Sequence, residues 1–271
     1  APLFGITSAS FKGVHLEDIN ISTNNIGIMG ALACTITATD AVSPKVENCS
    51  VSGTFTVNNE TYAPAKGSVA YGALVGKLLG GVIDGCVNNA TVDILKIINN
   101  TTSTTIYCGG VVGMITVFTK SDKSEIYSDV YNSVNYGAVT LKSTVTNNAY
   151  LGGIVGSSGD DNLSPQILSC ENYGVISADD GANITGSFAL AGIGGYVTGI
   201  KGVALTEHNT NHALITVKGN ATVSDELQMG GLFGNMKIPV NNSENKGMIH
   251  VEPTAKIATA NVGGILGVGL L

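Results

Sequence analysis

The feature that most constrains this chain is an internal repeat that runs through its whole length. The first repeated motif is five residues long and reads small residue, glycine, apolar, apolar, glycine. Its copies lie at Ile26–Gly30, Gly72–Gly76, Gly109–Gly113, Gly152–Gly156, Ala191–Gly195, Gly230–Gly234 and Gly263–Gly267, with a degenerate copy at Ala1–Gly5. They begin roughly 33–46 residues apart from Ile26 onward. Because a unit of about 40 residues cannot bury a core alone, neighbouring units must pack on one another.

A second motif of eight residues follows each of the first six complete copies of the first. Its second residue is Cys, Ser or Asn, its fourth is almost always Asn, and its sixth is Gly or Ala. The copies are Asn48–Phe55, Gly85–Val92, Asn132–Val139, Ser169–Ile176, His208–Ile215 and Asn242–Ile249. The stretch from a second motif to the next first motif is nearly constant, about 12–16 residues, whereas the other stretch varies from about 7 to 18. Variable connections are typically surface loops, where function tends to reside.

Composition and local pattern indicate that each repeat is made of β-strands. Gly accounts for 36 of 271 residues, and short β-branched runs such as Thr54–Val57 and Ala213–Val217 end in Gly, Asn or Ser clusters. We therefore predict an all-β fold, a parallel β-helix (β-solenoid) of about seven coils with one coil per repeat. A single domain would span residues 1–271, with a first coil at 1–25 and repeats starting near 26, 72, 109, 152, 191, 230 and 263.

The repeated residues then receive structural roles. Equivalent strands stack about 4.8 Å apart, so equivalent side chains form rows. The Asn of the second motif predicts an amide ladder made of Asn88, Asn135, Asn172, Asn211 and Asn245. Cys49, Cys86 and Cys170 share one repeat position with serine and asparagine, which favours an inward row over chemistry. We expect the repeated glycines to allow close backbone approach or a positive φ, and the Gly two residues after the ladder Asn to take the left-handed conformation.

Charge, cysteine and hydropathy patterns exclude several classes of protein. The net charge is −7, charged residues are only 12%, and the sequence holds neither Arg nor Trp, which argues against nucleic-acid binding. No apolar run reaches the ~18 residues of a membrane helix. The five cysteines include no CxxC pair, which disfavours a disulfide framework or a zinc knuckle and favours buried free thiols. The start at Ala1, with no signal run, predicts a mature or excised part of a longer protein.

The two motifs together also carry a family resemblance. Gly152–Gly156 followed by Ser169–Ile176 resembles the GLUG-type repeats of bacterial cell-surface proteins, found in the Bacteroides group and in some adhesins and secreted peptidases. Leu3–Ile6 and Phe11–Ile21 look like the family's first coil. The resemblance covers essentially the whole chain. It implies a right-handed β-helix at a bacterial surface, extracellular or on the outer membrane, and implies no particular activity.

Two candidate sites emerge from the variable loops. Asp160, Asp161 and Asn162 group hard oxygen ligands, so calcium is the one cofactor that we consider. The stretch Met114–Tyr131 forms a polar cluster in a charge-poor chain, and we expect it to form a recognition edge together with Ser157–Leu168. The residues of this loop edge are Lys120, Asp122, Lys123, Glu125, Tyr127, Asp129 and Tyr131. The alternative is that both stretches are simply solvated insertions.

Two functions remain open at this stage. The first is a non-enzymatic extracellular module for adhesion, binding or spacing, with a glycan or a surface protein as its partner. The second is a polysaccharide lyase or hydrolase, for which the carboxylate pairs at Asp160–Asp161 and Asp179–Asp180 are the candidates. No nucleophile or phosphate-binding signature supports the enzyme, and we favour the first function. The C-terminal edge is expected to meet a further domain or another molecule end to end.

Overall fold

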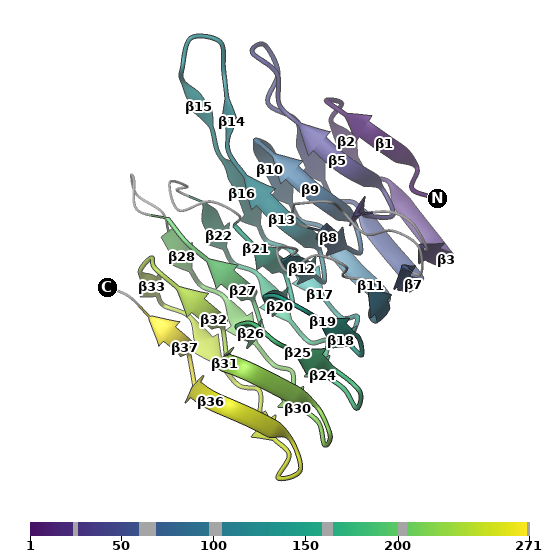
Figure 1. The fold of residues 1–271 in the computed structure, drawn as a ribbon. Helices are drawn as coiled ribbons and strands as arrows, with labels where there is room; N and C mark the ends of the chain where they lie inside the picture. Colours follow the sequence, from purple (N-terminus) through teal and green to yellow (C-terminus); the bar gives the residue numbers. More distant parts are fainter. Residues whose placement is uncertain (24–26, 60–68, 98–104, 159–164, 200–204, 270–271) are drawn as a thin grey trace.

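The chain forms a parallel β-solenoid (Figure 1). The computed structural model describes residues 1–23, 27–59, 69–97, 105–158, 165–199 and 205–269, and this part of the chain contains strands and no helix. Every strand pairing in it is parallel except one short hairpin. The predicted all-β solenoid is therefore confirmed.

The strands are arranged in four parallel sheets and the hairpin. The first sheet contains β1 (Phe4–Thr7), β5 (Ala33–Thr37), β9 (Val75–Leu79), β13 (Val112–Thr116), β21 (Val155–Ser157), β27 (Gly194–Val197), β32 (Phe233–Met236) and β37 (Leu266–Gly269). The second sheet contains β2 (Phe11–Lys12), β6 (Lys45–Glu47), β10 (Gly81–Asp84), β16 (Ser128–Tyr131), β22 (Gln166–Leu168), β28 (Leu205–Glu207) and β33 (Val240–Asn241). The hairpin pairs β14 (Phe118–Thr119) with β15 (Glu125–Ile126).

The third and fourth sheets complete each turn. The third sheet contains β3 (His15–Thr23), β7 (Ser50–Asn59), β11 (Val87–Ile97), β17 (Val134–Asn135), β18 (Val139–Leu141), β23 (Glu171–Asn172), β24 (Ile176–Ala178), β29 (Thr210–Asn211), β30 (Ile215–Val217), β34 (Glu244–Asn245) and β35 (Ile249–Val251). The fourth sheet contains β4 (Ile28–Met29), β8 (Val69–Gly72), β12 (Ile106–Gly109), β19 (Thr144–Val145), β20 (Ala149–Gly152), β25 (Asn183–Ile184), β26 (Phe188–Ala191), β31 (Thr222–Gly230) and β36 (Lys256–Gly263).

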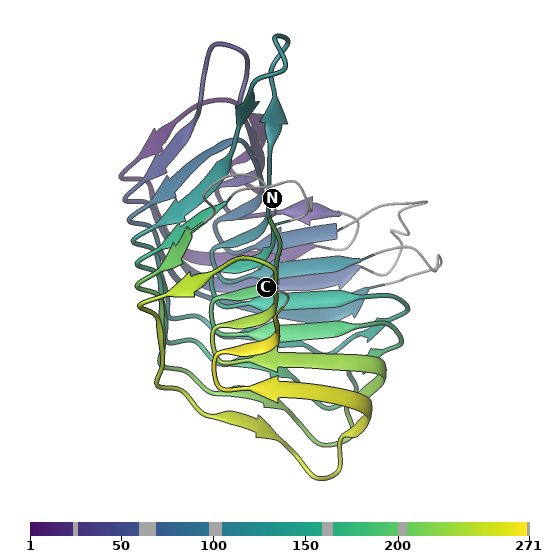
Figure 2. The same cartoon turned by 90° about the vertical axis from the view of Figure 1, so that its left-hand side faces the viewer.

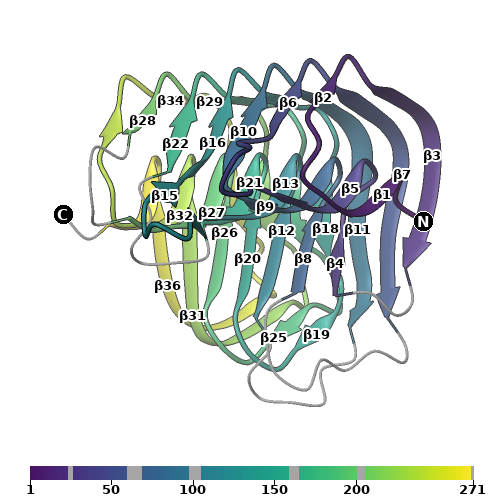
Figure 3. The ribbon, with the colours of Figure 1, turned by 90° about the horizontal axis from the view of Figure 1, so that it is seen from above.

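The stack has about six turns, where the sequence predicted about seven. The difference arises at the last copy of the first motif, Gly263–Gly267, which supplies only the end of β36 and the start of the terminal strand β37. Viewed from above, the turns lie one behind another, and the two chain ends lie at opposite ends of the stack (Figure 3). The long strands β3, β7 and β11 run side by side at the N-terminal end.

Apolar residues of successive turns form one continuous core. The apolar pair of the first motif is fully buried in the middle of the stack, as Val111 and Val112 and then Ile154 and Val155 show. Val112 of β13 pairs with Val155 of β21, so each core residue stacks on its counterpart in the next turn. This stacking explains the repeat, because a residue that suits one turn suits the same position in the next.

Close approach of the backbone, rather than a positive φ, accounts for the repeated glycines. A Cβ placed on Gly113 of β13 would lie 2.5 Å from the backbone nitrogen of Tyr71 in β8. A Cβ on Gly153 would overlap the carbonyl oxygen of Gly192 in the next turn. The first and fourth sheets therefore meet at a bend that only glycine can fill.

The expectation of a left-handed glycine two residues after the ladder Asn is wrong. Gly137, Gly174 and Gly247 lack a positive φ, and each has a carbonyl oxygen of the preceding turn where its Cβ would be. The left-handed residue is instead the first of the second motif, in all six copies. These residues are Asn48, Gly85, Asn132, Ser169, His208 and Asn242, with φ between 44° and 62°. Asn and Gly tolerate this conformation best, which explains their frequency at the position.

The variable connections lie where the chain passes from the first sheet to the second. The longest of these that the structure describes in full carries the hairpin β14–β15, which projects from the stack beside the loop between β5 and β6 (Figures 1 and 2). The backbone N–H of Ser121 at the hairpin tip donates to Asp40 Oδ1 of that loop, at 3.1 Å. The two insertions therefore share one corner.

Candidate functional site

A row of stacked aromatic side chains runs along the outside of the third sheet. Tyr136, Tyr173 and His212 occupy the fifth position of the second motif in three successive turns, directly after the ladder asparagines. The rings of Tyr136 and Tyr173 are stacked with centroids 5.1 Å apart, and those of Tyr173 and His212 with centroids 4.2 Å apart. Tyr136 is 53% exposed and Tyr173 is 41% exposed. Aromatic residues in a soluble protein are usually better buried, so this row is a candidate binding surface.

A carboxylate ties the row together. The hydroxyl of Tyr173 donates to Oε2 of Glu171 at 2.6 Å, and Nε2 of His212 lies 3.6 Å from the same oxygen. The hydrogen bond to Glu171 raises the pKa of the Tyr173 hydroxyl, because the neighbouring negative charge opposes its ionisation. The Glu171 carboxylate thus interacts with the phenol of Tyr173 and with the imidazole of His212 in the next turn.

Two exposed apolar side chains occupy the seventh position of the second motif, two residues after the position of the row. Val175, two residues after Tyr173, is 38% exposed, and Met248 in the last turn is 66% exposed. We call Tyr136, Glu171, Tyr173, Val175, His212 and Met248 the aromatic face. Because each ring face meets the next ring, the side chains present ring edges, hydroxyls and a carboxylate to solvent. The sequence shows these aromatic residues at equivalent positions but does not reveal that they stack or that they are exposed.

The Asn ladder lies directly inside this face. Nδ2 of each Asn donates to Oδ1 of the next, at 2.7 Å from Asn88 and Asn135 and at 2.8 Å from Asn172 and Asn211. Each Nδ2 also donates to a carbonyl oxygen two residues on in its own turn, for example from Asn172 to Gly174 at 3.0 Å. The ladder ends at Asn245, the C-terminal member. This network holds the bends from which the aromatic side chains project.

A second aromatic stack, which the sequence analysis did not identify, has a different character. Tyr107 and Tyr150 stack with centroids 5.7 Å apart, and Tyr150 and Tyr196 with centroids 4.7 Å apart. Tyr150 is only 9% exposed, and burial raises the pKa of its hydroxyl. We interpret this stack as part of the packing.

The structure separates the predicted loop-edge residues into two groups. Lys120, Asp122, Lys123, Glu125 and Tyr127 lie on or beside the hairpin β14–β15. Asp122 accepts hydrogen bonds from the backbone and hydroxyl of Ser124, which lower the pKa of its carboxyl group. Tyr127 donates its hydroxyl to Oε2 of Glu125 at 2.9 Å. These polar groups bond largely to one another, as in a stable turn.

The other two predicted residues, Asp129 and Tyr131, lie in β16 of the second sheet. The backbone N–H of Gln166 donates to Asp129 Oδ1 at 2.9 Å, and the hydroxyl of Tyr131 donates to Oε1 of the same Gln166 at 2.8 Å. Burial raises the pKa of the Asp129 carboxyl and of the Tyr131 hydroxyl. They join adjacent turns and do not continue the hairpin surface.

The predicted calcium ligands Asp160, Asp161 and Asn162 lie outside the described residues, as does part of the loop Ser157–Leu168. Within the part of the chain that the structure describes, no group of three or more His, Cys, Asp or Glu side chains has the arrangement of a metal site. The carboxylate of Asp179, considered above for catalysis, instead pairs with Lys218 at 2.8 Å and Lys142 at 3.8 Å.

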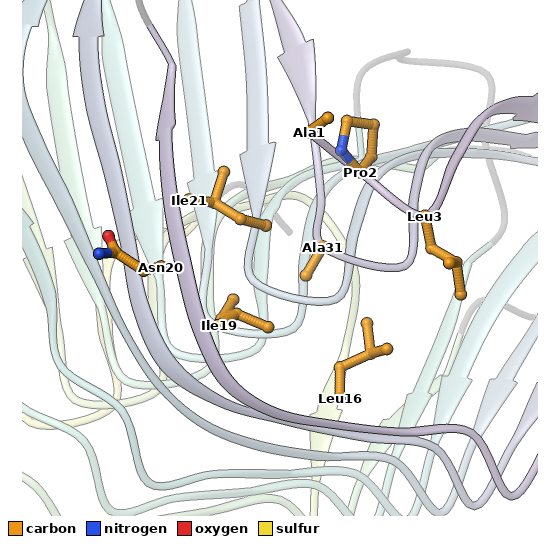
Figure 4. A pocket seen from close by; sticks show the side chains of 8 residues that line it. All are labelled: Ala1, Pro2, Leu3, Leu16, Ile19, Asn20, Ile21 and Ala31. Atoms are coloured by element: carbon orange, nitrogen blue, oxygen red, sulfur yellow. The ribbon is translucent and has the colours of Figure 1, made fainter.

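A hollow of about 390 Å³ opens at the N-terminal end of the stack (Figure 4). Its lining is almost entirely apolar and comes from the first residues, from β3 and from Ala31. Leu16, Ile19 and Ile21 of β3 point into the hollow (Figure 4). The hollow therefore borders the N-terminal part of the core.

Comparison with known proteins adds no relative to this picture. No family model, no curated protein and no solved structure matches the chain. Among the residues that the structure describes, no helix is long and apolar enough to cross a membrane.

Proposed function

We propose that the chain is a non-enzymatic extracellular β-solenoid of the GLUG-repeat type, which binds a surface glycan through the aromatic face. The observation that carries this proposal is the Tyr136–Tyr173–His212 stack along the stacking axis, in which both tyrosines are exposed and His212 is half-buried. A polymeric ligand with repeating units would meet the same kind of group turn after turn. The bacterial surface location is part of the proposal and rests on the repeat resemblance alone.

The chemistry of the face favours a glycan over a protein partner. Sugars present many hydroxyls, and the hydroxyls of Tyr136 and Tyr173 together with Glu171 and His212 offer donors and acceptors in a row. Sugar rings also have apolar faces, which the exposed side chains of Val175 and Met248 can cover. A protein partner would be expected to bury a larger continuous apolar centre.

The test combines a glycan array with a reducing-sugar assay on one preparation. We expect binding without release of reducing ends, and Tyr173→Ala is expected to weaken binding at least tenfold. Tyr127→Ala is the matched control, because Tyr127 is also a tyrosine whose hydroxyl donates to a glutamate two residues away, and it is partly exposed. Binding that is lost in Tyr127→Ala and kept in Tyr173→Ala would move the site to the hairpin. Release of reducing ends would favour the polysaccharide-active enzyme.

We also propose that the C-terminal edge meets a further domain or another molecule, as the sequence predicts. Val262 is 52% exposed and Ile265 is 37% exposed in the last turn, whereas the equivalent Met229 and Leu232 one turn earlier are fully buried. Sedimentation velocity over a range of concentrations tests the second possibility. A monomer at every concentration would exclude end-to-end association of this chain.

A further inference from the structure

One repeat position brings two cysteines into register in adjacent turns. It is the second residue of the second motif, occupied in successive turns by Cys49, Cys86, Ser133, Cys170, Asn209 and Ser243. Cys49 and Cys86 are consecutive, whereas Cys170 lies between Ser133 and Asn209. The position therefore contains one adjacent pair of thiols and one thiol without a sulfur neighbour in its own row.

The backbone holds this pair at the separation of neighbouring parallel strands. The next residues, Ser50 of β7 and Val87 of β11, are register partners, and the Val87 N–H donates to the carbonyl oxygen of Cys49 at 2.9 Å. Neighbouring strands lie about 4.8 Å apart, and disulfides need Cα atoms roughly 4.4–6.8 Å apart. Both side chains point into the core, with 1% and 0% of their surface exposed. Bridging therefore requires movement of the two side chains and little of the backbone.

The two thiols also differ in reactivity. The interaction between the two neighbouring thiols lowers the pKa of Cys49 and raises that of Cys86, and each thiol donates to a backbone carbonyl. Backbone groups of Gly13 and Val14 lower the pKa of Cys49 further. The thiolate is the attacking species in disulfide chemistry, so Cys49 is the first to react.

Access to Cys49 is controlled by the N-terminal turn. The N–H of Ser50 donates to the Val14 carbonyl at 2.9 Å, and the N–H of Gly13 donates to the Glu47 carbonyl at 2.9 Å. These bonds join the first turn of this chain to the second. Local opening of that contact makes the thiol reachable without global unfolding.

We propose that Cys49 and Cys86 form an inter-turn disulfide when the protein meets a small-molecule disulfide oxidant. The Cys49 thiolate attacks one sulfur of the oxidant, the oxidant's S–S bond breaks, and a mixed disulfide forms as one small thiol leaves. Cys86 then loses its proton to solvent and attacks the Cys49 sulfur, expelling the second small thiol. Two protein thiols are oxidised, one external disulfide is reduced to two thiols, and no other reactant is needed.

The experiment treats the reduced full chain with oxidised glutathione and counts free thiols. We expect the count to fall from five to three, with an intact mass lower by two hydrogens. Peptide mapping should link Cys49 to Cys86. Mild denaturant below the unfolding transition should speed the reaction, because it opens the terminal turn.

Two variants make the result decisive. Cys86→Ser is expected to fold, since Ser133 and Ser243 already occupy this position, and to lose the bridge while gaining a stable glutathione adduct at Cys49. Cys170→Ser should lose one thiol from the starting count and keep the bridge. A linkage that involves any other cysteine, or wild-type protein that retains five thiols in mild denaturant, would overturn the proposal.

Discussion

The Asn ladder allows a sharp prediction about stability, because its members are chemically identical and differ only in position. Asn172 lies in the middle and is fully buried. It receives a hydrogen bond from Asn135 and donates one to Asn211. Replacing it with Val, the residue that stands at the register position of Asn88 in the preceding turn (Val51), keeps the volume similar and removes both bonds together with the one to the Gly174 carbonyl.

The cost follows from the groups that lose their partners. Asn172→Val leaves an N–H of Asn135 and the carbonyl oxygen of Gly174 without their side-chain partner in a buried place, while Oδ1 of Asn211 keeps its bond from the Ala213 N–H. Each unpaired buried group costs about 1–3 kcal/mol. The expected decrease in the free energy of unfolding is therefore about 4 kcal/mol. With an unfolding entropy near 2 cal/mol/K per residue, this lowers Tm by roughly 7 °C. Asn245→Val at the partly exposed end of the ladder should cost about 1 kcal/mol, because water can reach the donor of Asn211.

Urea denaturation followed by far-ultraviolet circular dichroism measures both variants against the wild type. The double change Asn172→Val with Asn211→Val should cost less than the sum of the two single changes, since both single changes remove the same hydrogen bond between the two side chains. Equal costs at Asn172 and Asn245 would refute the reasoning, because they would show that the buried amide bonds contribute nothing beyond a local contact.

Three further changes test other features of the fold. Gly153→Ala places a methyl group against the Gly192 carbonyl and should lower the free energy of unfolding by about 3 kcal/mol or abolish folding. Gly264→Ala, with no atom within 4 Å of the new Cβ, should change stability by less than about 0.5 kcal/mol. Thermal denaturation compares the two variants. Ser169→Asn should stabilise the protein by up to about 1 kcal/mol, because Asn tolerates the left-handed φ of 55° better than Ser does; a lower denaturation midpoint would contradict this. Burial raises the pKa of Asp129, so the folded state binds its proton more tightly than the unfolded state and loses stability as pH rises through and above the ordinary carboxyl range. Asp129→Asn should therefore raise the urea midpoint at pH 7 and change it little at pH 3, and an equal effect at both pH values would argue against a buried-carboxylate origin.

The regular part of this fold follows from the sequence because stacking makes one position repeat. The Asn at the fourth place of the second motif and the apolar pair of the first motif both predict rows, and hydrogen bonds from Asn88 through Asn245 form such a row. The same logic failed for the glycines. A sequence shows that Gly137 and Gly174 recur, but not whether a bend or a crowded carbonyl requires them, and the structure shows the carbonyl.

The candidate site was harder to predict, for reasons of orientation. Charge density drew attention to the hairpin, where Asp122 and Glu125 bond mainly to their own neighbours. The aromatic face has few charged residues that would mark it in the sequence. Whether it can bind a ligand depends on whether Tyr136 and Tyr173 point outward or inward. In a regular strand, side chains alternate between the inside and the outside. Near a bend, the turn itself decides which residue points outward. The left-handed residue at the start of each second motif sets that phase here.

The direction in which the turns are stacked has a mechanical consequence. Because the two ends of the chain lie at opposite ends of the stack, tension between them acts along the axis on which the turns follow one another (Figure 3). Such a load separates the turn at the end of this chain from the next turn while the inner turns stay paired. The turns therefore detach one after another instead of together. The protein would then lengthen under force in steps of one turn each. A bridge between Cys49 and Cys86 would join two adjacent turns near one end and limit how far those turns could extend.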